Sequence, residues 1–139
     1  MGGYMATALT DRWATPPSII EDVQSEFGTI QLDPAADESN AVAERFFDEE
    51  ANGLIQDWNA ELVYVNPPYG RVLLDWVKKG LHEFDVGNAK RIVMLLPSRT
   101  CTRWFHLLYS RSDVEIRFIK GRLKYGDGSA PAPFPSLRS

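Results

Sequence analysis

A short apolar run that ends in two prolines constrains the fold of this chain more than any other feature. The run Leu62-Val63-Tyr64-Val65 is β-branched and aromatic, which predicts a buried strand. Asn66-Pro67-Pro68-Tyr69-Gly70 follows directly, and neither proline can donate a hydrogen bond to a sheet. We therefore expect the strand to end here and to present Asn66 and Tyr69 on a stiff turn at its carboxyl end, where ligands bind in open α/β sheets.

This turn suggests a specific chemistry. The exocyclic amine of adenine is a poor nucleophile because its lone pair is delocalised into the ring, and acceptors aimed at the amine hydrogens reduce that delocalisation. The Asn66 side-chain oxygen and the Pro67 carbonyl can act as acceptors, with Pro68 fixing Pro67 in extended geometry. Tyr69 can stack on a base swung out of a helix. We interpret Asn66, Pro67, Pro68 and Tyr69 as catalytic; the alternative is a strand-ending turn without a ligand.

Two further stretches are candidates for nucleotide binding. A short strand at 29–33 ends in Asp33-Pro34-Ala35-Ala36, and a carboxylate followed by small residues resembles a nucleotide-approach loop. Taken alone, this stretch is better explained as an ordinary Asp-Pro turn. Asp57-Trp58 can bracket an adenosyl ring, or it can be a core tryptophan beside a surface acid.

The first helix is expected to open at Thr15 as its N-cap, with Pro16 at the first helical position and Gly28 as its end. Its buried stripe is Ile19, Ile20, Val23 and Phe27. Beyond it, the pattern predicts a short helix at 39–47 and a longer helix at 71–84, whose buried stripe is Leu73, Trp76, Val77, Leu81 and Phe84. A continuous apolar strand is expected at 92–97, followed by a helix at 102–109 with Trp104, Phe105 and Leu108 inward. A half-exposed strand at 114–119 and a hairpin arm at 121–126 complete the predicted elements.

This alternation predicts an α/β fold with a mainly parallel sheet and helices on both faces. The 139 residues suffice for one domain with a core and not for two. We expect a flexible tail at 1–12 and a single domain at 13–139, with a basic arm over about 117–139. The chain shows no membrane-spanning run or signal-peptide pattern, and its single cysteine, Cys101, is typical of a reducing cytoplasm. His82 and His106 form no metal-ligand spacing, so no metal is expected.

Charge is unevenly distributed along the chain. Residues 1–96 carry 7 basic and 16 acidic side chains, whereas residues 97–139 carry 8 basic and 3 acidic ones. A basic C-terminal third on an acidic body can be the footprint of a polyanion, or these residues can simply decorate exposed faces. The basic residues that we expect to contact DNA are Arg99, Arg103, Lys120, Arg122 and Lys124.

The chain carries an ordered set of motifs: Thr15-Pro16, Leu32-Asp33-Pro34-Ala35-Ala36, Gly53-Leu54 with Asp57-Trp58, Asn66-Pro67-Pro68-Tyr69-Gly70, Leu95-Leu96-Pro97-Ser98-Arg99-Thr100 with Trp104-Phe105, Arg117-Phe118-Ile119-Lys120-Gly121-Arg122-Leu123 and Ala132-Pro133-Phe134-Pro135-Ser136. This set resembles the phage- and prophage-encoded DNA N-6-adenine methyltransferases of the Dam type. The resemblance covers nearly the whole chain, from about Trp13 to Ser136.

The resemblance implies a compact Rossmann-like domain that transfers a methyl group from S-adenosylmethionine to the N-6 amine of adenine in double-stranded DNA, with the adenine flipped out, in a bacterial cytoplasm. Asn66, Pro67 and Tyr69 would match the catalytic motif, and Arg99 and Thr100 would lie beside the target base. The cofactor-binding residues that it implies are Thr15, Pro16, Asp33, Pro34, Ala35, Asp57 and Trp58.

The chain also departs from the family pattern. No Gly-x-Gly follows the first strand, and the family continues beyond 132–136 into another apolar strand, so we expect a closing strand to be missing and one sheet edge to be open. Two alternatives stay open: a catalytically weak or inactive relative that binds DNA or nucleotide, and a methyltransferase for another planar amine, such as a protein glutamine or an RNA base. A cytosine-carbon methyltransferase is disfavoured, since its nucleophile is a cysteine and Cys101 does not follow a proline.

Overall fold

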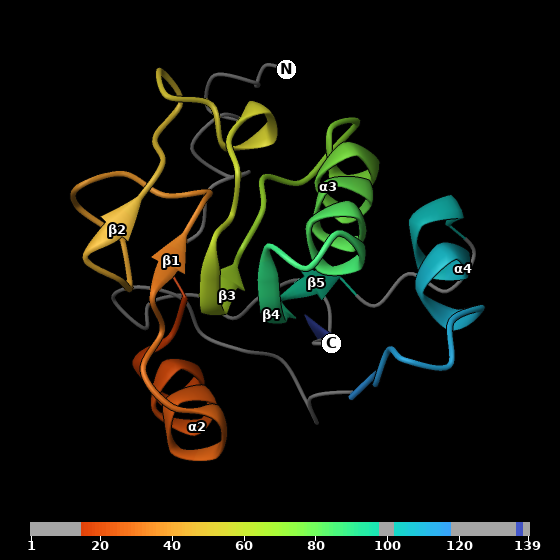
Figure 1. Ribbon diagram of the computed structural model, residues 1–139, viewed down its shortest axis with the longest axis horizontal. Coiled ribbons are helices and arrows are strands. Elements are labelled where there is room, and N and C mark those ends of the chain that lie inside the picture. Colours follow the sequence, from red (N-terminus) through yellow and green to blue (C-terminus); the bar gives the residue numbers. More distant parts are fainter. Residues whose placement is uncertain (1–14, 98–101, 118–135, 138–139) are drawn as a thin grey trace.

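The computed structural model describes residues 15–97, 102–117 and 136–137 (Figure 1). Its elements in chain order are α2 (Pro17–Phe27), β1 (Leu32–Asp33), β2 (Arg45–Phe46), the 3-10 helix η1 (Gly53–Ile55), β3 (Ala60–Val65), α3 (Leu73–Asp85), β4 (Ala89–Met94), β5 (Leu96–Pro97), α4 (Arg103–Tyr109) and β6 (Ser136–Leu137). Among the described residues, no helix is long and apolar enough to cross a membrane.

A four-stranded sheet of order β2-β1-β3-β4 lies at the centre, and all of its neighbouring strands are parallel. Leu32 of β1 lies opposite Val63 of β3, and Val63 lies opposite Ile92 of β4. The expected strand at 62–65 thus forms the last four residues of β3. The predicted α/β fold with a parallel sheet is confirmed.

The strand order changes direction between β1 and β3. The chain continues from β1 to β2 on one side, and from β3 to β4 on the other. Ligands of open α/β sheets bind outside the carboxyl ends of the strands at such a switch point. The loops that begin at Pro34 and at Asn66, both expected to belong to the site, lie on either side of this point.

Helices cover both faces of the sheet, and Figure 1 shows the strands between α2 and the pair α3 and α4. Successive residues of a strand point to opposite faces. Leu62 and Tyr64 pack in one buried cluster with Val23 of α2, while Val63 and Val65 pack in another with residues of α3 and α4. The sheet is therefore buried on both sides, which explains the continuous apolar run of β3.

The first helix begins one residue later than expected, at Pro17 instead of Pro16. Pro16, not Thr15, is the N-cap, and it is extended with φ −59° and ψ 138°. Pro17 accounts for this shift, because a residue before proline is disfavoured in the helical region. The expected end at Gly28 is confirmed, with φ +103° and its N–H bonded to the Gln24 carbonyl at 3.0 Å.

The short helix expected at 39–47 is wrong, because side chains capture the backbone donors of this stretch. Asp37 Oδ1 accepts the N–H groups of Ser39 and Asn40 at 2.8 and 3.2 Å, and Asp33 Oδ2 accepts that of Val42 at 3.2 Å. Such local bonds compete with helix formation. The chain instead turns and enters β2 beside β1, with Phe46 opposite Asp33.

α3 is confirmed, with Leu73, Trp76 and Val77 buried, but Phe84 is 37% exposed and does not face the core. Glu83 takes the buried position instead, at 1% exposure. α4 is also confirmed, with Thr102 as its N-cap and with the expected residues Trp104, Phe105 and Leu108 buried.

Two expected strands differ from the structure. The run 92–97 is divided between β4 and β5, and β5 pairs antiparallel with β6 rather than extending the main sheet. The strand expected at 114–119 is absent over 114–117. Val114 and Ile116 are half-buried against the core, so the apolar alternation reflects packing, and within the part of the chain that the structure describes no strand pairs with this segment. Residues 118–119, the hairpin arm at 121–126 and the tail at 1–12 lie outside the described residues.

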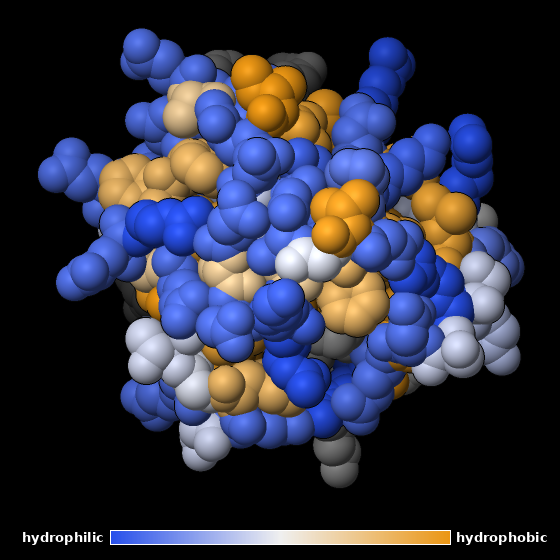
Figure 2. Space-filling view, in the orientation of Figure 1, coloured by the Kyte–Doolittle hydropathy of each residue, from blue (hydrophilic) through white to orange (hydrophobic). Residues whose placement is uncertain are grey.

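Within the described part of the chain, β4 pairs only with β3, so the sheet has the open edge that we expected. A hollow of about 250 Å³ lies beside this edge, lined by residues that include Val77, Leu81, Ile92 and Met94. Figure 2 shows a largely hydrophilic face in which apolar side chains form small, separate patches.

Candidate active site

The Asn66–Gly70 turn joins the end of β3 directly to α3. The sheet ladder still includes the Val65 carbonyl, which accepts the Leu95 N–H at 2.9 Å, and the Gly70 carbonyl accepts the Leu73 N–H at 3.1 Å. Gly70 has φ +101°, which allows the chain to turn into the helix. Pro67 is buried while Asn66, Pro68 and Tyr69 are half-buried, and Tyr69 packs against the core cluster of α3 and α4. The motif is therefore held between a strand and a helix.

The side chain of Asn66 is hydrogen-bonded to the segment that precedes α2. Asn66 Nδ2 donates to Thr15 Oγ1 at 3.1 Å. The same Thr15 oxygen lies 3.0 Å from the hydroxyl of Tyr64, a residue with 1% exposure. Thr15, which the resemblance placed in the cofactor site, thus lies beside the Asn66–Gly70 turn. The sequence pattern predicted no role for the Tyr64 hydroxyl, although a buried tyrosine usually has a hydrogen-bond partner for it.

Asp33 anchors the loop that follows β1. Its side chain is 4% exposed, and its two oxygens accept the N–H groups of Ala35 at 3.4 Å and Val42 at 3.2 Å. The loop is also joined to the chain before η1, since the Ala36 N–H donates to the Phe47 carbonyl at 3.1 Å. Pro34 and Ala35 are buried with it. The structure therefore shows Asp33 as the residue that shapes this loop.

Gly53 allows η1 to approach that loop closely. A Cβ atom on Gly53 would lie 2.1 Å from the Pro34 carbonyl oxygen, so no other residue fits without moving the backbone. The Gly53 carbonyl accepts the indole N–H of Trp58 at 2.8 Å. Gly53 appeared only as part of a motif in the sequence, and nothing in its spacing revealed this contact.

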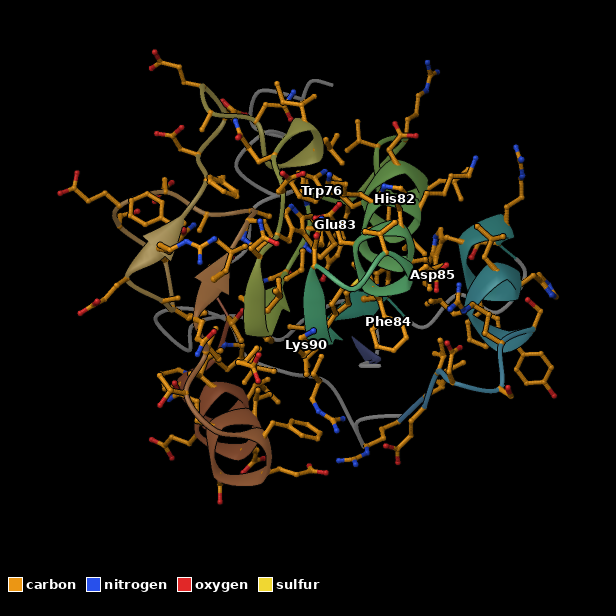
Figure 3. The ribbon with its side chains drawn as sticks, in the orientation of Figure 1. Trp76, His82, Glu83, Phe84, Asp85 and Lys90 are labelled. Carbon is orange, nitrogen blue, oxygen red and sulfur yellow. The ribbon has the colours of Figure 1, made fainter. Side chains whose placement is uncertain are left out.

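Glu83 of α3 holds Trp58 from the other side. Its Oε1 accepts the Trp58 backbone N–H at 2.5 Å and the Asn88 amide at 3.1 Å, and its Oε2 lies 3.3 Å from Lys79 Nζ. Figure 3 shows Glu83 and Trp76 on the side of α3 that faces the sheet. Burial alone would raise the pKa of Glu83, but the hydrogen bonds from Trp58, Asn88 and Lys79 outweigh it and hold the pKa below its ordinary value. The signal that sequence reasoning missed is that Glu83 lies seven residues after Trp76, on the buried stripe.

Asp57 and Trp58 are adjacent in the chain but differ in their exposure to solvent. Asp57 is exposed, whereas Trp58 has 0% exposure and stacks on Trp76 with ring centroids 6.1 Å apart. This placement agrees with the alternative of a core tryptophan beside a surface acid. A role for either residue at the cofactor's adenine stays a prediction, which the burial of Trp58 does not support.

Of the expected DNA contacts, only Arg103 belongs to the described residues; Arg99, Thr100, Lys120, Arg122 and Lys124 lie outside them. Arg103 is exposed and lines a hollow between α3 and α4 together with Lys78 and His106. Two other cations of the basic third face carboxylates.

Arg111 binds Asp85 and Asp113, and Arg117 binds Glu26 and Glu115. The hydrogen bonds from Arg111 hold the pKa values of Asp85 and Asp113 below their ordinary values. Two arginines of the basic third, which the charge pattern suggested as part of a polyanion-binding surface, are therefore paired with carboxylates of the protein.

The arrangement brings together a rigid amide and carbonyl at the end of β3 and a carboxylate-anchored loop at the end of β1. The first can accept hydrogen bonds from a planar amine, and the second can receive a nucleotide-like ligand at the switch point. Among the described residues, no three His, Cys, Asp or Glu side chains are grouped so as to hold a metal ion.

Comparison with known proteins gives consistent matches. A family model described as "DNA N-6-adenine-methyltransferase (Dam)" matches residues 3–133. A protein of Escherichia phage T1 named "DNA N-6-adenine-methyltransferase" is 38% identical over 99 residues, which are 70% of this chain and 40% of that protein. A protein of the same name from Haemophilus phage HP1 (strain HP1c1) is 33% identical over 110 residues, 78% of this chain and 62% of that protein. The chain thus spans less than two thirds of the length of each of these relatives.

Proposed function

The chain belongs to the DNA N-6-adenine-methyltransferase (Dam) family, and on this basis we propose that it transfers a methyl group from S-adenosylmethionine to the exocyclic N-6 amine of adenine in DNA. The substrate is double-stranded DNA with the target adenine flipped out, and the place of action is the cytoplasm of a bacterial host. Both relatives are named as DNA N-6-adenine-methyltransferases.

One structural observation supports the proposal most directly. The Asn66-Pro67-Pro68-Tyr69 turn lies at the carboxyl end of β3, next to the point where the strand order changes direction. A ligand held by the loop after β1 and an amine held by the turn after β3 would therefore meet across two neighbouring strands, whose usual spacing is about 5 Å.

The loop after β1 fits S-adenosylmethionine by its chemistry. Its residues are small or buried, and Gly53 leaves no side chain between the loop and η1. An ionised carboxylate can accept about four hydrogen bonds, so Asp33 can shape the loop and also receive the ligand's ammonium group or a bound water. Asp33, Pro34 and Ala35 would hold the cofactor. When bound, S-adenosylmethionine supplies the electrophilic methyl group.

The turn after β3 prepares the amine. Asn66 Oδ1 and the Pro67 carbonyl accept the two amine hydrogens, which localises the lone pair on nitrogen. The nitrogen gains positive charge as its bond to the methyl carbon forms, while the bond from that carbon to the sulfur of the methyl donor breaks and its electron pair stays on sulfur. The fixed acceptors would stabilise the charge on nitrogen without reorganising. One amine proton then leaves to solvent. Tyr69 stacks on the flipped base and keeps its plane beside these acceptors.

The test is methyl transfer by the purified chain. It is incubated with labelled S-adenosylmethionine and unmethylated duplex DNA, and in parallel with RNA and with a glutamine-containing protein extract. Nucleosides and amino acids are then separated by mass spectrometry. N-6-methyladenine formed in DNA alone supports the proposal. Label only in RNA or glutamine would transfer the assignment to another planar amine, and binding of DNA or cofactor without transfer would indicate an inactive relative.

A further inference from the structure

We propose that Thr15 is a positioning residue for this reaction: its hydroxyl fixes the orientation of the Asn66 amide so that the oxygen of that amide faces the target amine. The inference rests on the proposed function. It is carried by the contacts of one atom, Thr15 Oγ1, which lies 3.1 Å from Asn66 Nδ2 and 3.0 Å from the Tyr64 hydroxyl.

An asparagine amide has two ends of similar shape and opposite hydrogen-bonding character. The oxygen accepts and the nitrogen donates. An amide rotated by half a turn would aim its N–H groups at the hydrogens of the adenine amine, which would remove the acceptor and oppose the reaction. Because Nδ2 of Asn66 donates to Thr15, Oδ1 is held at the opposite edge of the planar amide group, away from Thr15.

The Thr15 hydroxyl can serve both neighbours. A hydroxyl carries one proton and two lone pairs, so Oγ1 can accept from Asn66 and bond to Tyr64 in either direction. It is not occupied by the helix that follows, because the N-cap of α2 is Pro16 and no side chain caps that helix. The Thr15 hydroxyl therefore forms hydrogen bonds at the end of β3 and does not cap α2.

Both supports of this hydroxyl are rigid. Tyr64 is 1% exposed within β3, in the cluster that also contains Val23 of α2. Pro16 and Pro17 follow Thr15 and have restricted φ angles, so the short path from Thr15 to the helix has little freedom. Leu62, Tyr64 and Asn66 alternate along the chain, which places Asn66 on the same side as α2. The fold thus brings residues 49 and 51 positions apart into one hydrogen-bonded row.

The experiment compares three forms of the full chain. Thr15→Val keeps the shape and removes the hydroxyl, and Thr15→Ser keeps the hydroxyl and removes a methyl group. For each we measure kcat and KM for duplex DNA, cofactor affinity by calorimetry, and the side-chain amide signals of Asn66 by NMR, assigned by their loss in Asn66→Ala. Thermal unfolding shows that each variant is folded.

We expect Thr15→Val to lower kcat about tenfold, with KM and cofactor affinity within about twofold of the wild type, and Thr15→Ser to recover most of the loss. The Asn66 amide signals should shift in Thr15→Val and stay near their wild-type positions in Thr15→Ser. An unchanged kcat and unchanged amide signals in Thr15→Val would overturn the inference. Weaker cofactor binding with kcat unchanged would also overturn it and would place Thr15 in the cofactor site. If the wild type itself transfers no methyl group to DNA, the proposed function fails instead, and the amide signals still show whether Thr15 holds Asn66.

Discussion

At the scale of single residues, function depends on which way a few donors and acceptors point. Asn66 is half-buried, and its Nδ2 is committed to Thr15 at 3.1 Å. Asp33 is buried, and its oxygens accept the backbone N–H groups of Ala35 and Val42. Each polar side chain is thus oriented by neighbours in the protein, which is the condition for stabilising charge without reorganisation.

The first prediction concerns Asn66. Replacing it with alanine removes one acceptor from the target amine, and kcat should fall about a hundredfold or more, the scale seen when a preorganised hydrogen-bonding group is lost. Cofactor affinity, measured by calorimetry, should change little. Asn59→Ala is the matched control, since Asn59 is an exposed asparagine just before β3. Normal methyl transfer by Asn66→Ala would show that this motif is not catalytic.

At the scale of elements, a chain of contacts connects α3 to the loop after β1. Glu83 accepts the Trp58 backbone N–H, Trp58 donates its indole N–H to Gly53, and Gly53 lies against Pro34. The loop after β1, which we propose to bind the cofactor, therefore depends on a helix that forms no part of it.

The second prediction compares two glycines. Gly53→Ala would place a methyl group 2.1 Å from the Pro34 carbonyl oxygen, so it should displace the loop and weaken cofactor binding at least tenfold. Gly80→Ala in α3 meets the flexible end of Met94 at 2.3 Å, and alanine favours a helix over glycine by about 1 kcal/mol. It should leave cofactor binding intact. Calorimetric titration of both variants tests this, and equal losses would contradict the role given to Gly53.

The third prediction concerns pH. The pKa of Glu83 lies below its ordinary value of 4.5, so the folded protein stabilises the ionised carboxylate. This contribution is fully present above the ordinary carboxyl range and is lost as the pH falls through the lowered pKa. Urea unfolding should show that Glu83→Gln lowers the free energy of unfolding by about 1–3 kcal/mol at neutral pH.

The difference between wild type and Glu83→Gln should shrink below pH 4.5. Glu61→Gln, a change at an exposed glutamate of β3, is the control and should have little effect at any pH. A difference between wild type and Glu83→Gln that does not vary with pH would mean that the carboxylate charge plays no part.

At the scale of the whole molecule, the proposed function requires a protein with an acidic body to bind a polyanion. Residues 1–96 carry a net charge of −9 and residues 97–139 one of +5. Ion pairs occupy Arg111 and Arg117, so the overall count overstates the cations available for DNA. The hollow between α3 and α4 adds Lys78 to Arg103 and extends the candidate DNA surface onto a helix of the acidic body.

The fourth prediction tests this surface. Arg103→Glu and Lys78→Glu should each weaken DNA binding and reduce its salt dependence, because log affinity changes by about 0.9 per log unit of salt for each phosphate neutralised. Lys90→Glu, the same change at the amino-terminal half of β4, is the control and should have a smaller effect. The combined reversal of Lys120, Arg122 and Lys124 should remove most of the remaining dependence. Fluorescence titrations over a range of salt concentrations measure each slope, and parallel slopes for all variants would exclude the surface.

The sequence by itself determined the local elements. The apolar run of β3, the prolines that end it, the stripe of α3 and the inward residues of α4 are set by side-chain patterns and backbone restrictions within a few residues. The motif residues Asn66 to Tyr69 could be named from the sequence for the same reason, as could the carboxylate at the end of β1.

Only the tertiary structure decided what these elements hold in place. The helix expected at 39–47 is wrong because Asp33 and Asp37 capture its backbone donors. The strand expected over 114–117 is wrong because no strand of the described residues pairs with it. The contacts of Thr15 with Asn66 and of Gly53 with Pro34 join residues far apart in the chain. Periodicity reports which side of an element is apolar, but it carries no information about which distant atom lies opposite, and that pairing is fixed only when the sheet and its helices pack.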